Sequence, residues 1–393
     1  MKRSDRRILT THTGSLPRPP DLVDALNAKE LGAAHDPYIL AGRVRRAIAE
    51  VVRKQADIGL DVIGDGEHSK VSWMAYARAR LSGLSEIDSP VRFRGATRDS
   101  LAFAGAYEDM KVMLAGRSGA IVAKRTVRPK AWICSGPVAY VGQEELRADL
   151  ANLKAALAGV TAEEAFVTAI SPSNLELYYE NHHYKTDEDY LGALADAMQV
   201  EYKAIVDAGF VLQIDDPRMA THYNRTPGAS IKDCRKFIAL RVEAVNHALR
   251  GIAADRVRFH TCYSVNIAPR VHDFELRHFV DLMLKVNATA YVIEAANPRH
   301  EHEWELWKDV GLPEDKILVP GVVSHAIHLV EHPELVAQRI ARFAGVVGRE
   351  RVIAGTDCGF GTSGAGDEVH PDVAWAKLAA LVEGARLAGK ALY

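Results

Sequence analysis

Two patterns of apolar residues alternate along the chain, one typical of buried strands and one typical of helices. Short, continuous apolar runs, such as residues 210–214 and 317–323, are typical of strands buried on both faces. Longer stretches, such as residues 191–208, have the apolar spacing of a helix and stop at a glycine, here Gly209. Strand-like and helix-like stretches follow one another through the whole chain. This alternation predicts a parallel sheet with helices packed outside it.

Nine apolar runs qualify as strands, one more than a barrel needs, and we assign the first, near Leu9, as the extra one. Polar and thiol residues come at the carboxyl ends of these runs. A (β/α)8 barrel gathers such ends in one site, whereas an open doubly wound sheet spreads them along a crevice. We therefore predict an α/β fold, a (β/α)8 TIM barrel with elaborated loops. Residues 1–393 form a single catalytic barrel, and residues 84–130 are a candidate insertion over its mouth. The strand-end residues are Ser15, Glu67, Asp215, His260, Cys262, Glu294, His325 and Cys358.

The composition of the chain argues against nucleic-acid-binding, membrane-spanning and disulfide-rich classes of protein. The chain has 393 residues, 48% of them hydrophobic, which is ample for a large core. A net charge of -2 gives no broad basic surface and argues against nucleic acid as a partner. No apolar run reaches the length of a membrane span, and the four cysteines lack the spacing of a disulfide framework. These features predict a cytoplasmic protein with no membrane partner.

Four of the strand-end residues are of the types that zinc prefers as ligands. His260 and Cys262 are two positions apart at the end of one strand, so their side chains point to the same face. Glu294 and Cys358 end two later strands. A single buried cysteine or histidine is more often a core residue than a ligand. The four together, however, form the mixed N, O and S set of a tetrahedral Zn²⁺ site, and we predict that they bind this ion.

Six segments of the chain resemble the catalytic barrel of cobalamin-independent methionine synthase. The likeness covers nearly all of the chain, and the segments occur in the family's order. Those around the four candidate zinc ligands are the most specific. The segments are residues 10–17 (TTHTGSLP), 65–67 (DGE), 212–217 (LQIDDP), 259–263 (FHTCY), 292–294 (VIE) and 356–359 (TDCG).

This resemblance implies zinc-dependent methyl or alkyl transfer to a thiol, in the family homocysteine, which becomes methionine. The four candidate ligands match the residues that hold the family's zinc. Residues matching Gly14, Ser15, Glu67 and Asp215 hold the amino acid part of homocysteine. That assignment is chemically reasonable, because carboxylates suit an ammonium group, and loop N–H groups with a hydroxyl suit a carboxylate.

The chain also departs from the family's pattern. The full-length enzymes carry a second barrel that helps to hold folate, and this chain has the length of one barrel. The family's Asp-x-His near the last strands is replaced here by a segment with Ser324 and an offset His325. We take His325 as the candidate catalytic residue that handles the proton, with His328 as the alternative. We expect methyl-folate to be a poor donor, and a methylated corrinoid on a partner protein, a sulfonium or a strained ring to serve better.

Three other functions remain open at this level. A thiol transferase that opens epoxides, similar to epoxyalkane:coenzyme M transferase, would use the same zinc chemistry, and Arg125 and Arg128 could meet its sulfonate. A decarboxylase on a barrel like that of uroporphyrinogen decarboxylase would need no metal. A non-catalytic, zinc-stabilised barrel would have a closed site. The pattern does not indicate an oligomeric state.

Overall fold

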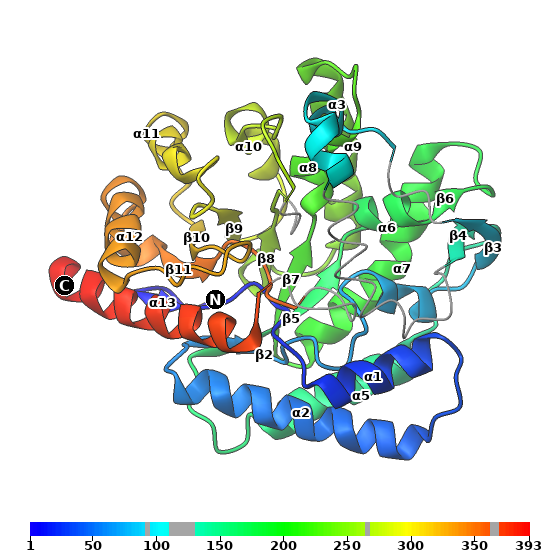
Figure 1. Cartoon of the computed structure of the whole chain (residues 1–393), viewed down its shortest axis with the longest axis horizontal. Helices are drawn as coiled ribbons and strands as arrows, with labels where there is room; N and C mark the ends of the chain where they lie inside the picture. The colour runs from blue at the N-terminus through cyan, green and yellow to red at the C-terminus, as the bar shows by residue number, and fades with distance from the viewer. Residues whose placement is uncertain (91–94, 110–129, 264–267, 362–368) are drawn as a thin grey trace.

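The computed structural model describes residues 1–90, 95–109, 130–263, 268–361 and 369–393 of the chain (Figure 1). Its centre is a sheet of eight parallel strands in the order β1-β11-β10-β9-β8-β7-β5-β2. A parallel bridge between Thr11 and Val62 joins the two ends of this sheet, so it closes into the predicted barrel. The barrel strands are β1 (Leu9–Thr10), β2 (Val62–Gly64), β5 (Glu164–Ile170), β7 (Val211–Asp215), β8 (Val257–His260), β9 (Ala290–Glu294), β10 (Ile317–Val323) and β11 (Ile353–Thr356).

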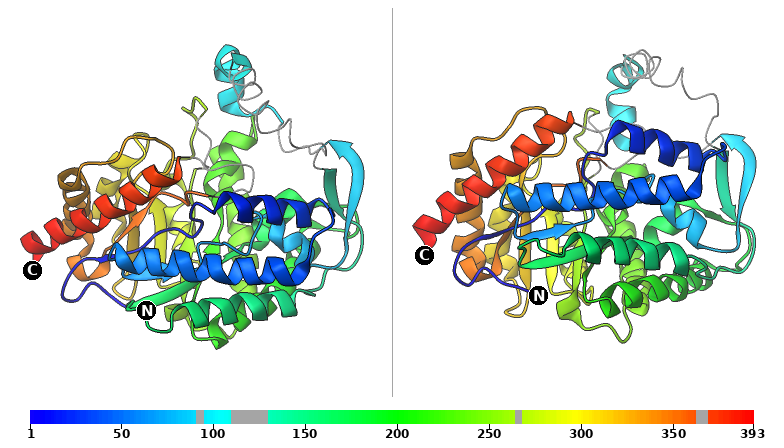
Figure 2. Two further views of the ribbon diagram at one scale, coloured as in Figure 1. Left: turned by 60° about the horizontal axis from the view of Figure 1, so that its bottom comes forward. Right: turned by 90° about the horizontal axis from the view of Figure 1, so that it is seen from below.

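Helices surround the strands, as Figures 1 and 2 show. The C-terminal α13 packs mainly on α12, and α7 packs on α9. None of the helices in the described ranges combines the length and the apolar character that a membrane span requires. The helices are α1 (Pro20–Glu30), α2 (Pro37–Asp57), α3 (Arg98–Ala102), α5 (Gln143–Ala156), α6 (Pro172–Tyr178), α7 (Asp187–Asp207), α8 (Pro217–Arg225), α9 (Ile231–Ala248), α10 (Val280–Met283), α11 (Leu306–Val310), α12 (Pro333–Val347) and α13 (Pro371–Leu392), with the 3-10 turns η1 (Ala75–Arg80) and η4 (Glu301–Glu305).

The assignment of the run near Leu9 as the extra strand was wrong. β1 belongs to the barrel, where Leu9 pairs with Ile353 and Thr10 pairs with Ala354 of β11. Asp61 fixes its other side, because its Oδ2 accepts hydrogen bonds from the backbone N–H of Thr10 at 2.7 Å and from its hydroxyl at 2.9 Å. β1 is only two residues long, so tertiary pairing rather than any periodicity of its own makes it a strand.

The surplus strand is the run that begins at Ala131. It forms most of β4 (Lys130–Cys134), which lies outside the barrel in a three-stranded sheet with β3 (Leu84–Pro90) and β6 (Glu180–Asn181). β4 is antiparallel to β3 and parallel to β6. This small sheet lies at the edge of the molecule beside α6 and α7 (Figure 1).

The predicted insertion at residues 84–130 is described only in part. α3, within it, is attached to α8 by hydrogen bonds from the Arg98 guanidinium to the Tyr223 carbonyl at 2.8 Å and from the Asn224 amide to the Asp99 carboxylate at 2.7 Å. Residues 91–94 and 110–129, and with them Arg125 and Arg128, lie outside the described residues. The single-barrel division of residues 1–393 stays a prediction.

Candidate metal centre and substrate pocket

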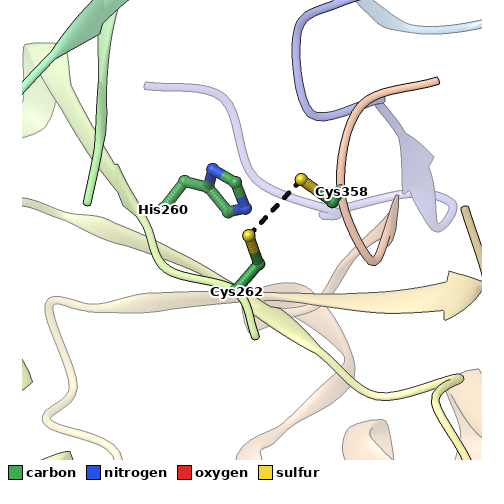
Figure 3. Close-up of side chains that lie close together, drawn as sticks. All are labelled: His260, Cys262 and Cys358. Carbon is green, nitrogen blue, oxygen red and sulfur yellow. Dashed lines mark hydrogen bonds between the residues drawn. The ribbon is translucent and has the colours of Figure 1, made fainter. Parts of the chain in front are cut away.

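His260, Cys262 and Cys358 form a compact, buried cluster beyond the carboxyl ends of two strands (Figure 3). His260 ends β8, Cys262 follows two residues later, and Cys358 comes two residues after β11. One ligand atom from each side chain lies within 4.8 Å of the others, and the two Sγ atoms are 3.4 Å apart. The structure therefore brings together three of the four predicted metal ligands.

Asp215, at the end of the neighbouring β7, fixes the orientation of the His260 ring. Its Oδ1 atom lies 2.8 Å from His260 Nδ1, so this nitrogen carries the proton that the carboxylate accepts. Nε2 faces the cluster and would supply its lone pair to a bound metal ion, which requires the neutral ring. Apart from the thiols that it faces, this buried atom has no hydrogen-bond partner among the described residues. A buried polar atom left open in this way is expected where a ligand binds.

The protons of the cluster are strongly redistributed. Burial alone would lower the pKa of His260, but the neighbouring Cys262 and Asp215 raise it. The hydrogen bond with Cys358 lowers the pKa of the Cys262 thiol in spite of its burial, and it raises the pKa of Cys358. The arrangement thus stabilises a cysteine thiolate, which is the form that binds metal ions.

Glu294, the fourth predicted ligand, ends β9 but is engaged elsewhere. Its Oε1 accepts a hydrogen bond from the backbone N–H of Tyr263 at 2.7 Å, and its Oε2 accepts one from the side-chain amide of Asn297 at 2.8 Å. Within the described ranges, the close ligand group contains His260, Cys262 and Cys358 but not Glu294. Its carboxylate is therefore a neighbour of the cluster whose two oxygens already have partners.

A neutral histidine holds the loop after β1 in place. Burial and the charge of Arg258 lower the pKa of His12 to about 3. Its Nδ1 accepts a hydrogen bond from the backbone N–H of Gly14 at 3.2 Å, and its Nε2 donates one to the side-chain oxygen Oε1 of Gln55 at 2.8 Å. This bond fixes the start of the predicted substrate loop against α2.

Two glycines allow that loop to approach the site closely. Gly14 has a φ of 127°, and a Cβ there would lie 2.7 Å from Thr168 Cγ2 and 3.1 Å from Glu67 Oε1. A Cβ on Gly359 would lie 2.0 Å from the Oγ of Ser15. Larger side chains would therefore push the loop away from Glu67 on one side and from the segment after Cys358 on the other.

Glu67 combines an unusual backbone with an open carboxylate oxygen. Its φ of 59° is the only positive value for a non-glycine residue in the described parts of the chain. Oε1 accepts a hydrogen bond from the Thr168 hydroxyl at 2.8 Å, whereas buried Oε2 accepts none there and lies 3.9 Å from Arg18 Nη2. Burial raises the pKa of Glu67, and the charge of Lys70 opposes this rise. Such strained and incompletely paired residues cluster at functional sites.

The sequence model described as "Cobalamin-independent synthase, Catalytic domain" matches residues 8–170 and 137–381. The chain belongs to the cobalamin-independent methionine synthase family. It is 26% identical over 385 residues to a methionine synthase of Saccharolobus islandicus, covering 96% of this chain and 94% of that one. A methionine synthase of Thermococcus kodakarensis is 25% identical over 386 residues, with 98% and 94% covered.

The fold is also that of a solved member of the family. The structure of a B12-independent methionine synthase from a Shewanella species, in complex with selenomethionine, superposes with a TM-score of 0.71. The two chains share 18% sequence identity, and the superposition covers 98% of this chain and 99% of the other. This likeness supports the barrel architecture.

Sequence reasoning missed two residues that support the metal cluster of this synthase-family barrel. Both lie on the strands, two residues before Asp215 and His260. Gln213 donates a hydrogen bond to Asp215 Oδ1 at 2.7 Å and a second to the Thr13 carbonyl at 2.7 Å. Arg258 in turn donates to Gln213 Oε1 at 2.6 Å. A polar chain therefore leads from Arg258 through Gln213 and Asp215 to His260. Its sequence signal is a long polar side chain two residues before each strand-end residue, which places it on the same face.

Asp357 is a third residue that was missed. Its Oδ1 accepts hydrogen bonds from the backbone N–H groups of Ala295 at 2.8 Å and Ala296 at 2.9 Å. Asp357 thereby ties the segment of Cys358 to the turn after Glu294. Gly321 makes room for it, since a Cβ there would lie 2.3 Å from Asp357 Oδ1. A glycine inside an apolar strand was the available signal for this close approach.

The two candidate proton-handling histidines differ in burial. His325 follows β10 after one residue and is buried, with 1% of its surface exposed. His328 lies at the exposed tip of the same loop. Their environments distinguish the two residues where the sequence did not.

Proposed function

We propose that this protein transfers a methyl group to the thiol of homocysteine, forming methionine, at a zinc ion held by His260, Cys262 and Cys358. The observation that carries the proposal is the buried Nε2 of His260, which faces two thiols whose sulfurs are 3.4 Å apart. The family to which the chain belongs, and relatives named methionine synthase, support this reaction class.

The donor set fits zinc. One imidazole nitrogen and two cysteine sulfurs are soft or borderline ligands, and three protein ligands with an open fourth position are typical of catalytic zinc sites. Bound zinc would supply thiol activation, because a coordinating thiol loses its proton. The site residues do the rest: Asp215 orients His260, and the hydrogen bond with Cys358 stabilises the thiolate of Cys262.

Glu294 is proposed as the exchangeable fourth ligand. Its carboxylate is a harder ligand than the thiolates, and it has alternative partners in Tyr263 and Asn297. It can therefore leave the metal position without becoming an unpaired buried charge. The incoming substrate thiol would take that position.

The amino acid part of homocysteine is proposed to bind between the loop after β1 and the ends of β2 and β7. Glu67 Oε2 accepts no hydrogen bond from the described residues and is suited to the ammonium group, together with Asp215. The backbone N–H groups around Gly14 and the hydroxyl of Ser15 are suited to the carboxylate. This placement would bring the side-chain thiol toward the cluster.

In the transfer step, the bond from sulfur to methyl carbon forms as the bond from the donor to that carbon breaks. His325 is proposed to donate a proton to the leaving atom of the donor where that atom requires one. Its burial favours it over the exposed His328 for work inside the site.

The donor is proposed to be more activated than methyl-folate. Neutral tertiary amines are poor leaving groups unless protonated, and Ser324 stands where the family has the acid that supports its histidine. A methylated corrinoid carried by a partner protein would not require that acid. The epoxide-opening alternative is not favoured, because relatives similar to this chain carry the methionine synthase name; Arg125 and Arg128, which could meet its sulfonate, lie outside the described residues.

The test combines metal spectroscopy with turnover. The purified protein is titrated with homocysteine, coenzyme M and cysteine while X-ray absorption follows the ligands of its metal. We expect homocysteine to add one sulfur and to displace an oxygen ligand. Methyl-folate and a methyl-corrinoid are then supplied in parallel, and methionine is measured. A protein that binds no metal, or that responds only to coenzyme M, would contradict the proposal.

A further inference from the structure

A buried lysine on α13 is paired with the loop that carries His325. Lys377 is fully buried, and its Nζ donates hydrogen bonds to Glu331 Oε2 at 2.8 Å and to the carbonyl of Leu329 at 2.5 Å. A buried ammonium group without such partners would be strongly destabilising. The C-terminal helix and the loop are therefore held together by this contact.

Glu331 extends the same support to the beginning of the loop. Its Oε1 accepts a hydrogen bond from the backbone N–H of Ser324 at 2.8 Å, directly before His325. The hydroxyl of Ser324 accepts a further bond from the backbone N–H of Ala326 at 3.2 Å, directly after His325. The backbone on both sides of His325 is thus fixed, and the carboxylate of Glu331 is the link from this turn to Lys377.

The middle of the loop has a different character. Leu329 and Val330 are 76% and 45% exposed, and Ile327 is 39% exposed. These side chains bury too little surface to hold the loop in one conformation. The contacts of Glu331 and Lys377 at the base of the loop therefore hold the backbone beside His325.

We propose that Glu331 and Lys377 are positioning residues that hold His325 in place for proton transfer. The inference rests on the proposed function, because it concerns the residue that handles the proton there. Glu331 acts on the backbone of the loop, through the N–H of Ser324. A pair with a purely structural role would affect only stability, whereas a positioning pair would also affect turnover after stability has been restored.

The decisive variant is the double substitution Glu331→Leu with Lys377→Met. Replacing a buried ion pair by apolar residues of similar size is often neutral or stabilising, so the fold and the melting temperature should be kept. We expect kcat to fall by about 10–100-fold, by analogy with the loss of partners that orient metal ligands. The KM for homocysteine and the metal content should not change. Hydrogen exchange in residues 322–331 should become faster.

Glu331→Gln is the milder companion, because it keeps an acceptor for the Ser324 N–H. It should lose less of kcat than the double variant. Glu201→Gln is the matched control, since Glu201 is also a buried carboxylate but pairs with Arg80 and not with the loop after β10. It should leave kcat and the exchange of residues 322–331 as in the wild type.

Wild-type kcat and wild-type exchange in the double variant would overturn the positioning role. If the wild type itself makes no methionine, the proposed function fails, and the exchange measurement alone then decides whether the pair anchors the loop. Faster exchange would support the anchoring, and unchanged exchange would refute it. The two failures are therefore distinguishable.

Discussion

Two buried polar clusters in this molecule differ in how fully their atoms are paired. The first, the Arg80 network, consists of Tyr76, Arg80, Tyr140, Asp149 and Glu201 and connects η1 with α5 and α7. The hydroxyls of Tyr76 and Tyr140 donate to the two oxygens of Glu201 at 2.8 and 2.7 Å. Arg80 lies between Glu201, at 3.4 Å, and Asp149. Every side chain of the Arg80 network has a partner.

The second cluster, at the barrel mouth, leaves atoms open. Among the described residues, His260 Nε2, Glu67 Oε2 and Asp357 Oδ2 are buried without a hydrogen-bond partner, save for the thiols beside His260. Leaving such atoms unpaired costs free energy that the Arg80 network does not lose. The difference suggests a division of work. The saturated cluster stabilises the fold, and the open one is kept for ligands.

The largest expected effect would come from the open cluster. Cys358→Ser should lose the bound metal and reduce methionine formation to background, because the serine hydroxyl is a poor zinc ligand at neutral pH. The melting temperature of the metal-free form should change little. Cys234→Ser, a buried thiol on α9, is the control and should keep metal and activity. Metal analysis of the two variants is the test. Full zinc occupancy in Cys358→Ser would show that the open cluster is not the metal site.

The saturated cluster should behave in the opposite way. Glu201→Gln removes the charge that faces Arg80 and should lower the free energy of unfolding by about 3–5 kcal/mol. Activity per folded molecule and metal content should remain at wild-type values well below the melting temperature. Denaturant titration, together with metal analysis, checks both parts. Loss of metal from this variant would show that the two clusters are not independent.

Local spacing in the sequence was sufficient to predict some of this architecture. The pair His260 and Cys262 is set by the period of a strand, and the strand-helix alternation specified the barrel. β1 could not be recognised as a barrel strand, because its two residues have no period and are held by Asp61 and β11. The apolar run at Ala131 looked more convincing, yet it pairs with β3 outside the barrel. Which strands pair is a non-local property.

The site shows the same limit. Sequence reasoning named the residues at strand ends, and the structure brings His260, Cys262 and Cys358 together. It missed Gln213, Arg258 and Asp357, whose importance depends on contacts across strands. The position of Glu294, engaged by Tyr263 and Asn297, could not have been read from its place at the end of β9. Hydrogen-bond partners on other strands and loops are determined by tertiary packing.

A third buried group sharpens the comparison through pH. His300 lies between Glu303, at 3.0 Å, and Asp273, at 3.2 Å, and stacks on Tyr263 with ring centroids 3.6 Å apart. Burial would lower the pKa of His300, but these two carboxylates raise it from 6.5 to about 9. The protonated form is therefore favoured in the folded protein. Its stabilising contribution is complete below pH 6.5 and is lost as the pH rises through about 9.

We expect this group to contribute about 3 kcal/mol of pH-dependent stability over that range. His300→Gln should remove that part of the slope in unfolding free energy between pH 6.5 and 9. Equal slopes in wild type and His300→Gln would show that His300 is not protonated between Glu303 and Asp273 in this pH range.

The smallest expected effect lies where the two kinds of cluster meet, at Asp215. One of its oxygens is paired with His260 and Gln213, as in a saturated network, and we also propose it as a partner for the substrate ammonium. Asp215→Asn keeps the shape but removes the charge. If Asp215 only orients His260, Asp215→Asn should weaken metal affinity by about 10–100-fold and should weaken the binding of all thiols equally.

A role in ammonium binding adds a difference between thiols. Wild type should bind homocysteine more tightly than the corresponding thiol without the amino group, by about 1.5–3 kcal/mol for a hydrogen bond to a charged group. Asp215→Asn should lose a large part of this difference even when metal is saturating. The neighbouring Asp216→Asn is the control, since asparagine caps a helix as well as aspartate does, and Asp216 caps α8. Isothermal titration with both thiols measures the effect. If wild type binds the two thiols equally, Asp215 serves only to orient His260 and belongs with the saturated kind of cluster.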